Sequence, residues 1–110
     1  MHQNRDLEAA QEKIHFKIQD EGLDKHNLLI IELAEEDDLN PSLNGLLAMK
    51  CAARYQRPTL VLRTNNEGYA RGSIRNVNNS KLEDLKAYLL NTGLCEYCQG
   101  HSNAAGISIK

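Results

Sequence analysis

This 110-residue chain reads Gln99-Gly100-His101-Ser102-Asn103-Ala104-Ala105-Gly106 near its end, and the stretch runs directly into Ile107-Ser108-Ile109-Lys110. Glycine permits positive φ and lets a ligand or another backbone come close. The apolar alternation that follows is typical of a strand. We therefore predict a polar loop held at a strand end, where a small anionic ligand could bind. A tight turn with a surface histidine is the other interpretation, because one glycine-histidine pair is a weak signal.

The composition is that of one ordinary globular domain, with 41% apolar and 25% charged residues. Thirteen Lys and Arg stand against 15 Asp and Glu, a net charge of -2, which argues against a strongly basic nucleic-acid clamp but leaves room for a local basic patch. No apolar run is long enough to span a membrane, and no secretory signal is present. Three cysteines make no disulfide framework and favour the reducing cytoplasm. Because a strand-like pattern continues to Lys110, we expect a piece of a longer protein.

Apolar periodicity in the first half predicts a helix, a strand and a second helix. Asp6–Asp20 carries one apolar stripe and ends before Gly22, as a linking or packing helix does. The apolar run within Asn27–Leu33 is typical of a strand buried on both faces. Asn40 and Pro41 are a cap and first residue for a helix that runs to about Tyr55. Four acidic residues lie between the predicted strand and this second helix: Glu35, Glu36, Asp37 and Asp38. They are either a solvated charged run before the helix or carboxylate ligands for a divalent metal.

The second half predicts two hairpinned strands, a helix and the final strand. Thr59–Leu62 and Tyr69–Arg75 flank a turn cluster at 65–68. Ser80-Lys81-Leu82-Glu83 fits a capping box for a helix over Ser80–Asn91. In that helix the side chains expected to face inward are Leu82, Leu85, Tyr88 and Leu89.

The strand Tyr69–Arg75 also carries a possible phosphate site. Arg71, Ser73 and Arg75 alternate and therefore share one face. Two guanidinium groups and a hydroxyl suit a phosphate, because arginine offers paired charged hydrogen bonds and serine adds a donor. A solvent-facing strand side with charges that aid solubility is the equal alternative.

Cys95 and Cys98 stand three residues apart, with His101 close behind. This spacing suggests either zinc or a redox pair, but a structural zinc site needs four ligands and no second pair of this kind exists. A redox motif normally opens a helix after a strand, which does not fit here. Two partly buried structural cysteines are the simplest interpretation, and Cys51 is expected to be a buried apolar residue.

Taken together, the motifs resemble the C-terminal, substrate-binding domain of the DHH-type phosphoesterases, and RecJ-like single-strand-specific exonucleases above all. The resemblance covers about 27–110 and leaves 1–26 as a linking helix. It rests on the order and spacing of three pieces, Gly45-Leu46-Leu47-Ala48 followed by Arg57-Pro58-Thr59-Leu60-Val61-Leu62, then Gly72-Ser73-Ile74-Arg75, then Gly100-His101-Ser102-Asn103-Ala104-Ala105-Gly106.

The resemblance implies an α/β fold, a small mixed sheet with helices packed on it. It also implies that a separate N-terminal domain with an Asp-His-His motif binds two Mn²⁺ or Mg²⁺ ions, and that the present domain holds single-stranded DNA or a short oligonucleotide, as in DNA repair. Substrate contacts would come from one strand and one glycine-rich segment: Ser73, Arg75, Gly100, His101, Asn103, Ala104, Ala105 and Gly106, with Arg71 beside them.

The chain departs from the family pattern in four respects. Gln99 replaces a glycine before the histidine, and Asn76 stands where serine is common. The acidic run Glu35–Asp38 is not part of the pattern, and no Asp-His-His motif occurs. The chain alone is therefore expected to bind rather than to hydrolyse, and to hold no cofactor. The alternatives are the substrate domain of an oligonucleotide or cyclic-dinucleotide phosphodiesterase, and a non-catalytic regulatory module with zinc at Cys95, Cys98 and His101.

Overall fold

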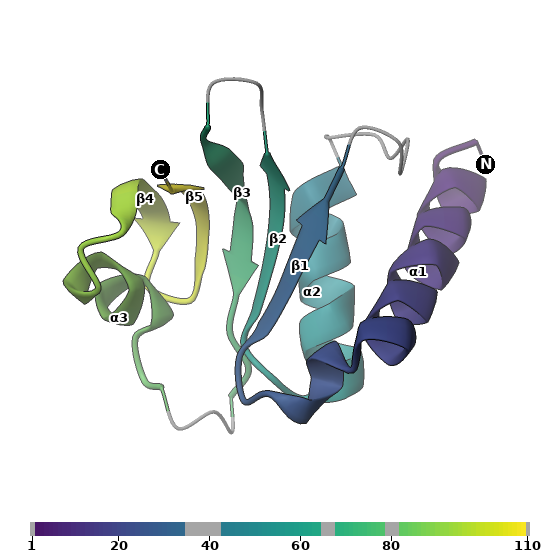
Figure 1. The fold of residues 1–110 in the computed structure, drawn as a ribbon, viewed down its shortest axis with the longest axis horizontal. Coiled ribbons are helices and arrows are strands. Elements are labelled where there is room, and N and C mark those ends of the chain that lie inside the picture. The colour runs from purple at the N-terminus through teal and green to yellow at the C-terminus, as the bar shows by residue number, and fades with distance from the viewer. Residues whose placement is uncertain (1, 35–42, 65–67, 79–81, 110) are drawn as a thin grey trace.

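A five-stranded mixed sheet organises the fold (Figure 1). This computed structural model describes residues 2–34, 43–64, 68–78 and 82–109, with side chains from Leu7 onward. No helix in those ranges has the length and apolar character needed to cross a membrane. In chain order the elements are α1 (His2–Glu21), the short 3-10 helix η1 (Leu23–Lys25), β1 (Leu29–Leu33), α2 (Asn44–Tyr55), β2 (Thr59–Thr64), β3 (Ala70–Arg75), α3 (Leu85–Asn91), β4 (Cys95–His101) and β5 (Ala104–Ile109).

The strands lie in the order β1-β2-β3-β5-β4. Only β1 and β2 are parallel, and helix α2 makes the crossover between them. The other pairs are antiparallel. This confirms the α/β fold with a small mixed sheet, and it confirms that β2 and β3 form a hairpin.

Two apolar clusters lie on opposite faces of the sheet. One joins α1 and α2 to β1 and to Val61 of β2. The other joins α3 to Leu60, Leu62, Ile74 and Ile107. Since successive strand residues point to opposite faces, Val61 and its neighbours Leu60 and Leu62 make β2 the strand that both clusters share. Helix α1 belongs to the first cluster, and the boundary at residue 26 between a linking helix and a domain stays a prediction.

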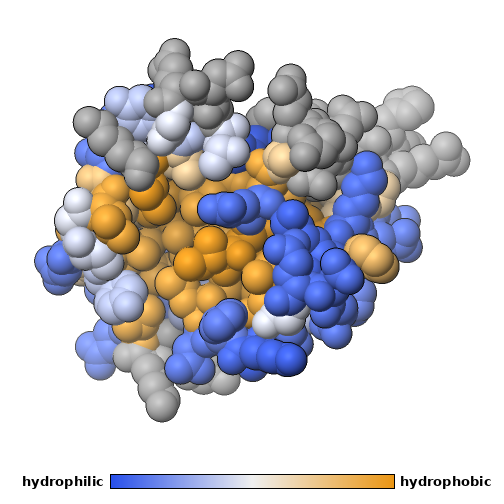
Figure 2. Space-filling view, in the orientation of Figure 1, coloured by the Kyte–Doolittle hydropathy of each residue, from blue (hydrophilic) through white to orange (hydrophobic). Residues whose placement is uncertain are grey.

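The prediction that β1 is buried on both faces is wrong. Leu29, Ile31 and Leu33 are buried, whereas Glu32 is exposed and Ile30 keeps 42% of its surface in water. The reason lies in the placement of the helices, because α1 and α2 cover one face of β1 while α3 packs near β3 and β4 at the far side of the sheet. Figure 2 shows the result, a broad hydrophobic area on the face of the molecule opposite α2.

The third helix begins at Leu85, five residues later than the capping box predicts. The Asp84 carboxylate accepts a hydrogen bond from the Ala87 amide at 2.9 Å, so Asp84 is the N-cap. Leu85 and Leu89 are buried as predicted, but Tyr88 is 47% exposed, which corrects its placement in the core. The predictions for Glu35–Asp38, for Asn40-Pro41 and for Ser80 fall outside the described residues.

Two other boundaries differ modestly from expectation. The first helix starts earlier than Asp6 but ends as predicted before Gly22, which adopts a left-handed conformation with φ 66°. The predicted loop at Gln99–Gly106 is instead a hairpin: Gln99, Gly100 and His101 belong to β4, and the turn consists only of residues 102–103. Continuous strand pairing is the reason, because it satisfies the backbone hydrogen bonds of this segment.

Replacing the α3 cap tests this assignment. Asp84→Ala is expected to lower the free energy of unfolding by about 1 kcal/mol, because the Ala87 amide loses its partner. Urea denaturation followed by circular dichroism measures the change. Glu83→Ala is the matched control, since Glu83 is exposed and precedes the cap. Equal effects of the two substitutions would show that Asp84 is not the cap.

Candidate functional site

Alternation along β3 places Arg71, Ser73 and Arg75 on the α2 side of the sheet. Their neighbour Ile74 is fully buried in the α3-side cluster, so the odd-numbered residues of β3 point the other way. This confirms the prediction that the three share a face. The same face receives Arg63 of β2, which pairs directly with Arg71, so three guanidinium groups gather there.

The strand register extends this face across β5 and β4. Arg75 pairs with Ala104, which pairs with His101, and Ser73 pairs with Gly106, which pairs with Gln99. Directly paired residues project to the same face of a sheet. We use the name open face for the surface formed by Ser73, Arg75, Gln99, His101, Ala104 and Gly106.

The centre of the open face has little side-chain bulk. Ala104 and Gly106 lie on β5, an interior strand with neighbours on both sides, yet both stay half-exposed. A Cβ built on Gly106 would have only the Gly72 carbonyl oxygen near it, at 3.8 Å. The open face can therefore accept a ligand close to the backbone, with polar groups from Arg75 on one side and from His101 on the other.

Gly45, the second residue of α2, brings the start of this helix against the same arginine. A Cβ there would lie 2.7 Å from Nη2 of Arg75 and 3.8 Å from Oγ of Ser73. The N-terminus of a helix offers free N–H donors to an anion. Gly45 is not among the site residues predicted from the sequence. The available signal was a glycine inside the first turn of a helix, where it costs roughly 1 kcal/mol relative to alanine.

Arg75 and Arg71 differ in the contacts that their guanidinium groups already make within the protein. Arg71 donates to Oγ of Ser108 at 3.3 Å, lies 3.9 Å from a Glu96 carboxylate oxygen and sits over the Tyr69 ring. Arg75 donates only to the Ile74 carbonyl oxygen at 2.6 Å, and within the described ranges no carboxylate pairs with it. The free charge on the open face thus belongs to Arg75.

The side chain of Asn103 is exposed, but its amide is engaged in hydrogen bonds that hold the turn. Its Oδ1 accepts from the Leu85 amide at 3.1 Å and from Nδ2 of Asn76 at 2.7 Å. Its Nδ2 donates to the Glu83 carbonyl oxygen at 3.2 Å. The side chain therefore ties the β4–β5 turn to the start of α3 and to the end of β3. Asn76, where the family commonly has serine, is the partner that completes this network.

The remaining predicted residues are divided between the two faces. Ala105 is buried in the α3-side cluster, so its side chain is part of the core and not of the open face. Gly100 pairs with Ala105, has φ 134°, and a Cβ there would come within 2.9 Å of the Ala104 carbonyl oxygen. Gly100 is thus required for the close approach of β4 to β5, while His101 is exposed beside the turn.

The structure does not bring Cys95, Cys98 and His101 together on one face of the sheet, so zinc binding by these three residues stays a prediction. Cys98 pairs with Ile107 and faces the α3-side cluster, whereas His101 lies on the open face. Within the described ranges no three His, Cys, Asp or Glu residues come together as metal ligands. Burial raises the pKa of both the Cys95 and the Cys98 thiols, as expected for structural cysteines. Burial also raises the pKa of Cys51 to about 11, although Arg54 nearby lowers it.

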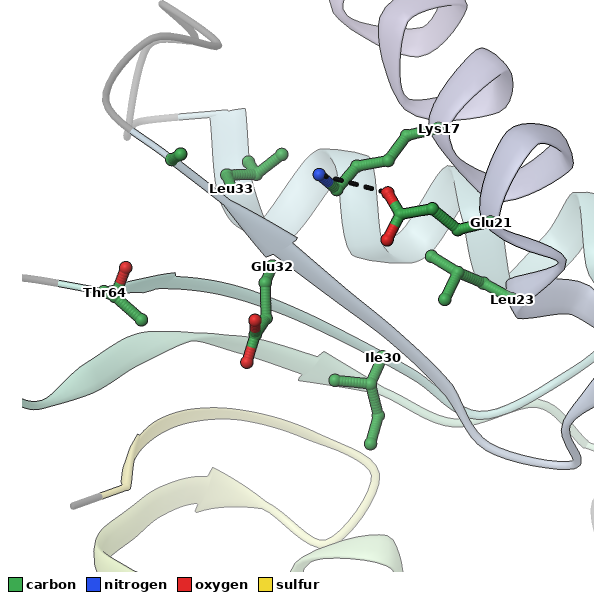
Figure 3. Close-up of a pocket in the computed structure, with 8 residues that line it drawn as sticks. Lys17, Glu21, Leu23, Ile30, Glu32, Leu33 and Thr64 are labelled. Atoms are coloured by element: carbon green, nitrogen blue, oxygen red, sulfur yellow. Dashed lines mark ion pairs between the residues drawn. The ribbon is translucent and has the colours of Figure 1, made fainter.

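Three cavities among the described residues lie outside the open face. One, of about 270 Å³, follows Arg75 at the end of β3 and is lined by polar residues that include Asn76, Asn78 and Asn103. A second, of about 350 Å³, lies at the edge of β1 (Figure 3). Its one lysine, Lys17, pairs with Glu21 at 3.3 Å and Glu32 adds another carboxylate, so this cavity does not suit an anion. The third lies between α1 and α2.

A protein of known structure has a part with the same fold as this chain. RecJ from Thermus thermophilus, crystallised with Mn²⁺ and with Mg²⁺, superposes with TM-scores of 0.63 and 0.60 at 18% identity. The match covers 97% of this chain and 15% or 16% of RecJ. The fold is that of a part of RecJ. No family model matches the chain.

Two relatives are more similar in sequence. They are the SPbeta prophage-derived protein YorK of Bacillus subtilis (strain 168) and its counterpart in Bacillus phage SPbeta, both provisionally named single-strand DNA-specific exonucleases. Each is 37% identical over 111 residues, which is 98% of this chain but 19% of the relative. The chain therefore spans about a fifth of the length of these relatives, and its resemblance to a domain of a RecJ-like exonuclease is confirmed.

Two glycines of the sheet should respond differently to substitution. A Cβ on Gly72 would overlap the Val61 carbonyl oxygen, whereas Gly106 has open space. Gly72→Ala is expected to destabilise the protein by several kcal/mol, beyond the usual range for a single change. Gly106→Ala should change stability by less than about 1 kcal/mol. Thermal unfolding compares the two, and comparable losses would contradict the open space at Gly106.

Proposed function

We propose that this chain is the substrate-binding domain of a RecJ-like, single-strand-specific DNA exonuclease, and that the open face holds phosphate groups of the strand. One observation carries the proposal: Arg75, without a carboxylate partner in the described chain, lies with Ser73 against the start of α2 and beside a half-exposed floor at Ala104 and Gly106. The similarity to YorK over nearly the whole chain supports the choice of single-stranded DNA.

Each group on the open face has a distinct part in binding. The Arg75 guanidinium can give two parallel charged hydrogen bonds to one phosphate, which fixes both position and orientation. The Ser73 hydroxyl and the first amides of α2 add neutral donors to the same phosphate. His101, across the small floor, offers a second contact to a neighbouring part of the strand. The domain thus positions the substrate, which is how a non-reacting domain contributes to a rate.

We assign this chain no step in bond cleavage. The described residues do not form a metal site, and the metal ions named for the RecJ crystals belong to those proteins. We propose that a separate N-terminal domain with Mn²⁺ or Mg²⁺ supplies hydrolysis in the complete protein. The three cysteines are all free, which supports a reducing compartment such as the cytoplasm.

The two arginines of β3 provide the direct test of this function. Arg75→Ala should weaken binding of a 5′-phosphorylated oligo-dT at low salt by about tenfold or more, because a charged hydrogen bond is lost. Arg71→Ala is the matched control on the same strand face, and it should have a small effect because Arg71 is already held by Ser108 and Glu96. Fluorescence anisotropy measures both.

Salt dependence and competition complete this test. Loss of one phosphate contact should reduce the slope of log affinity against log salt by about 1 in Arg75→Ala. Equal losses in the two arginine variants would overturn the assignment. If a cyclic dinucleotide displaces oligo-dT at far lower concentration than unlabelled oligo-dT does, the substrate is the cyclic dinucleotide and the exonuclease proposal fails.

Gly45→Ala separates binding from stability. The new methyl group would lie 2.7 Å from Nη2 of Arg75, which is too close, and the guanidinium can move away because it is the flexible end of its side chain. Stability should stay equal or rise by up to about 1 kcal/mol, since alanine favours the helix. Oligo-dT binding should nevertheless fall severalfold. Unchanged binding in the folded variant would show that the start of α2 does not contact the strand.

A further inference from the structure

The cavity between α1 and α2 collects polar groups that the proposed function does not use. It measures about 360 Å³, within the range of small-molecule sites. Helix α1 supplies Gln11 and His15, and the second half of α2 supplies the rest. The lining residues are Gln11, His15, Lys50, Cys51, Ala53, Arg54 and Tyr55.

The cavity carries two positive charges that no ion pair in the described ranges compensates. They belong to Lys50 and Arg54, which are one turn apart on α2. A cation in the last turn of a helix stabilises the helix dipole, which is sufficient reason for Arg54. Lys50 is exposed to solvent in the middle of α2, where the helix dipole gives a cation no such advantage. Two adjacent cations without carboxylate partners over a cavity favour an anionic ligand.

A chain of hydrogen bonds orients the inner wall. Nη2 of Arg54 lies 3.4 Å from Nε2 of His15, and Nδ1 of His15 bonds to the Tyr55 hydroxyl. Arginine can only donate, so Nε2 accepts and Nδ1 carries the proton. The Tyr55 hydroxyl therefore accepts from His15 and keeps its own proton for another acceptor. Arg54 also lies 5.7 Å from the centre of the Tyr55 ring, which holds the guanidinium at the cavity.

The size of the cavity and its other lining residues indicate that the ligand is larger than an inorganic anion. The cavity is much larger than one phosphate, and Ala53, Cys51 and the Tyr55 ring give it an apolar side. Burial keeps the Cys51 thiol protonated by raising its pKa to about 11, so this thiol acts as a neutral wall and not as a nucleophile. Gln11 adds a carboxamide that can both donate and accept.

We infer that this cavity binds a mononucleotide, with its phosphate on Lys50 and Arg54 and its nucleoside against Tyr55 and Gln11. The cavity and Gly45 lie on roughly opposite sides of α2. Each residue of an α-helix turns by roughly 100° about the axis, and Lys50 and Arg54 follow Gly45 by five and nine residues. The nucleotide site is thus separate from the open face, and it does not depend on the proposed function.

The test is a titration of the chain with deoxythymidine monophosphate, followed by NMR and calorimetry. We expect one binding site, amide shifts at Gln11, His15 and Tyr55, weaker binding of inorganic phosphate, and no measurable binding of thymidine. Lys50→Met should weaken nucleotide binding by about tenfold through loss of a charged contact. Methionine favours a helix nearly as well as lysine does, so this variant is expected to fold.

Two controls locate the site. Lys25→Met removes an exposed cation from η1, outside the cavity, and should leave nucleotide binding unchanged. Arg75→Ala should also leave it unchanged while it weakens oligo-dT binding, which keeps failure of this inference distinct from failure of the proposed function. Competition with a 5′-phosphorylated oligo-dT then distinguishes two sources of the ligand. If the oligonucleotide displaces the nucleotide, the ligand is the phosphorylated end of a strand. If it does not, the ligand is the free nucleotide. Absence of nucleotide binding, equal binding of thymidine, or loss in Arg75→Ala but not in Lys50→Met overturns the inference.

Discussion

The pairing of β3 with β5 is the constraint on which both the core and the open face depend. In this register Ile74 lies beside Ala105 within the α3-side cluster, while Ser73 lies beside Gly106 on the other face. A shift by one residue would exchange the faces and put guanidinium groups into the core. Burial of Ile74 therefore selects the register, and that register in turn places the charged groups on the open face.

Three glycines near this pairing serve three different purposes. Gly72 lets β2 and β3 pair at all, because a side chain would overlap the Val61 carbonyl. Gly100 permits a backbone with positive φ close to β5. Gly106 has open space around its Cβ position, which is the feature that the proposed binding of a ligand uses. Whether a glycine is needed for the fold or leaves room for a ligand thus depends on which atoms surround its Cβ position.

Much of the fold could be predicted from the sequence because its signals are local. The apolar stripe of α2, the alternation of β3 and the glycine after α1 depend on near neighbours in the chain, and the structure bears them out. The exposure of Ile30 depends on where α3 packs, more than 50 residues later. Local pattern carries no such information.

The candidate site likewise has features that follow from local sequence and features that do not. Alternation was enough to put Ser73 and Arg75 on one face. It could not show that Ala105 belongs to the core, that Asn103 is occupied by Leu85, Glu83 and Asn76, or that Gly45 meets Arg75, because each of these depends on pairing between distant segments. The predicted start of α3 was too early because the observed start depends on more than the local sequence. Asp84 caps the helix, and Asn103 of the β4–β5 turn accepts a hydrogen bond from the Leu85 amide.

The hydrogen bonds of Asn103 also bear on the order in which the chain folds. The unit from α3 through β4 to β5 is continuous in sequence, and its turn is fastened to the helix that precedes it. Closing so short a loop costs little chain entropy. The parallel pair β1 and β2 must instead wait for a crossover through α2. We expect the C-terminal unit to form early and to offer β5 as a template on which β3 docks, with α1 and β1 joining last.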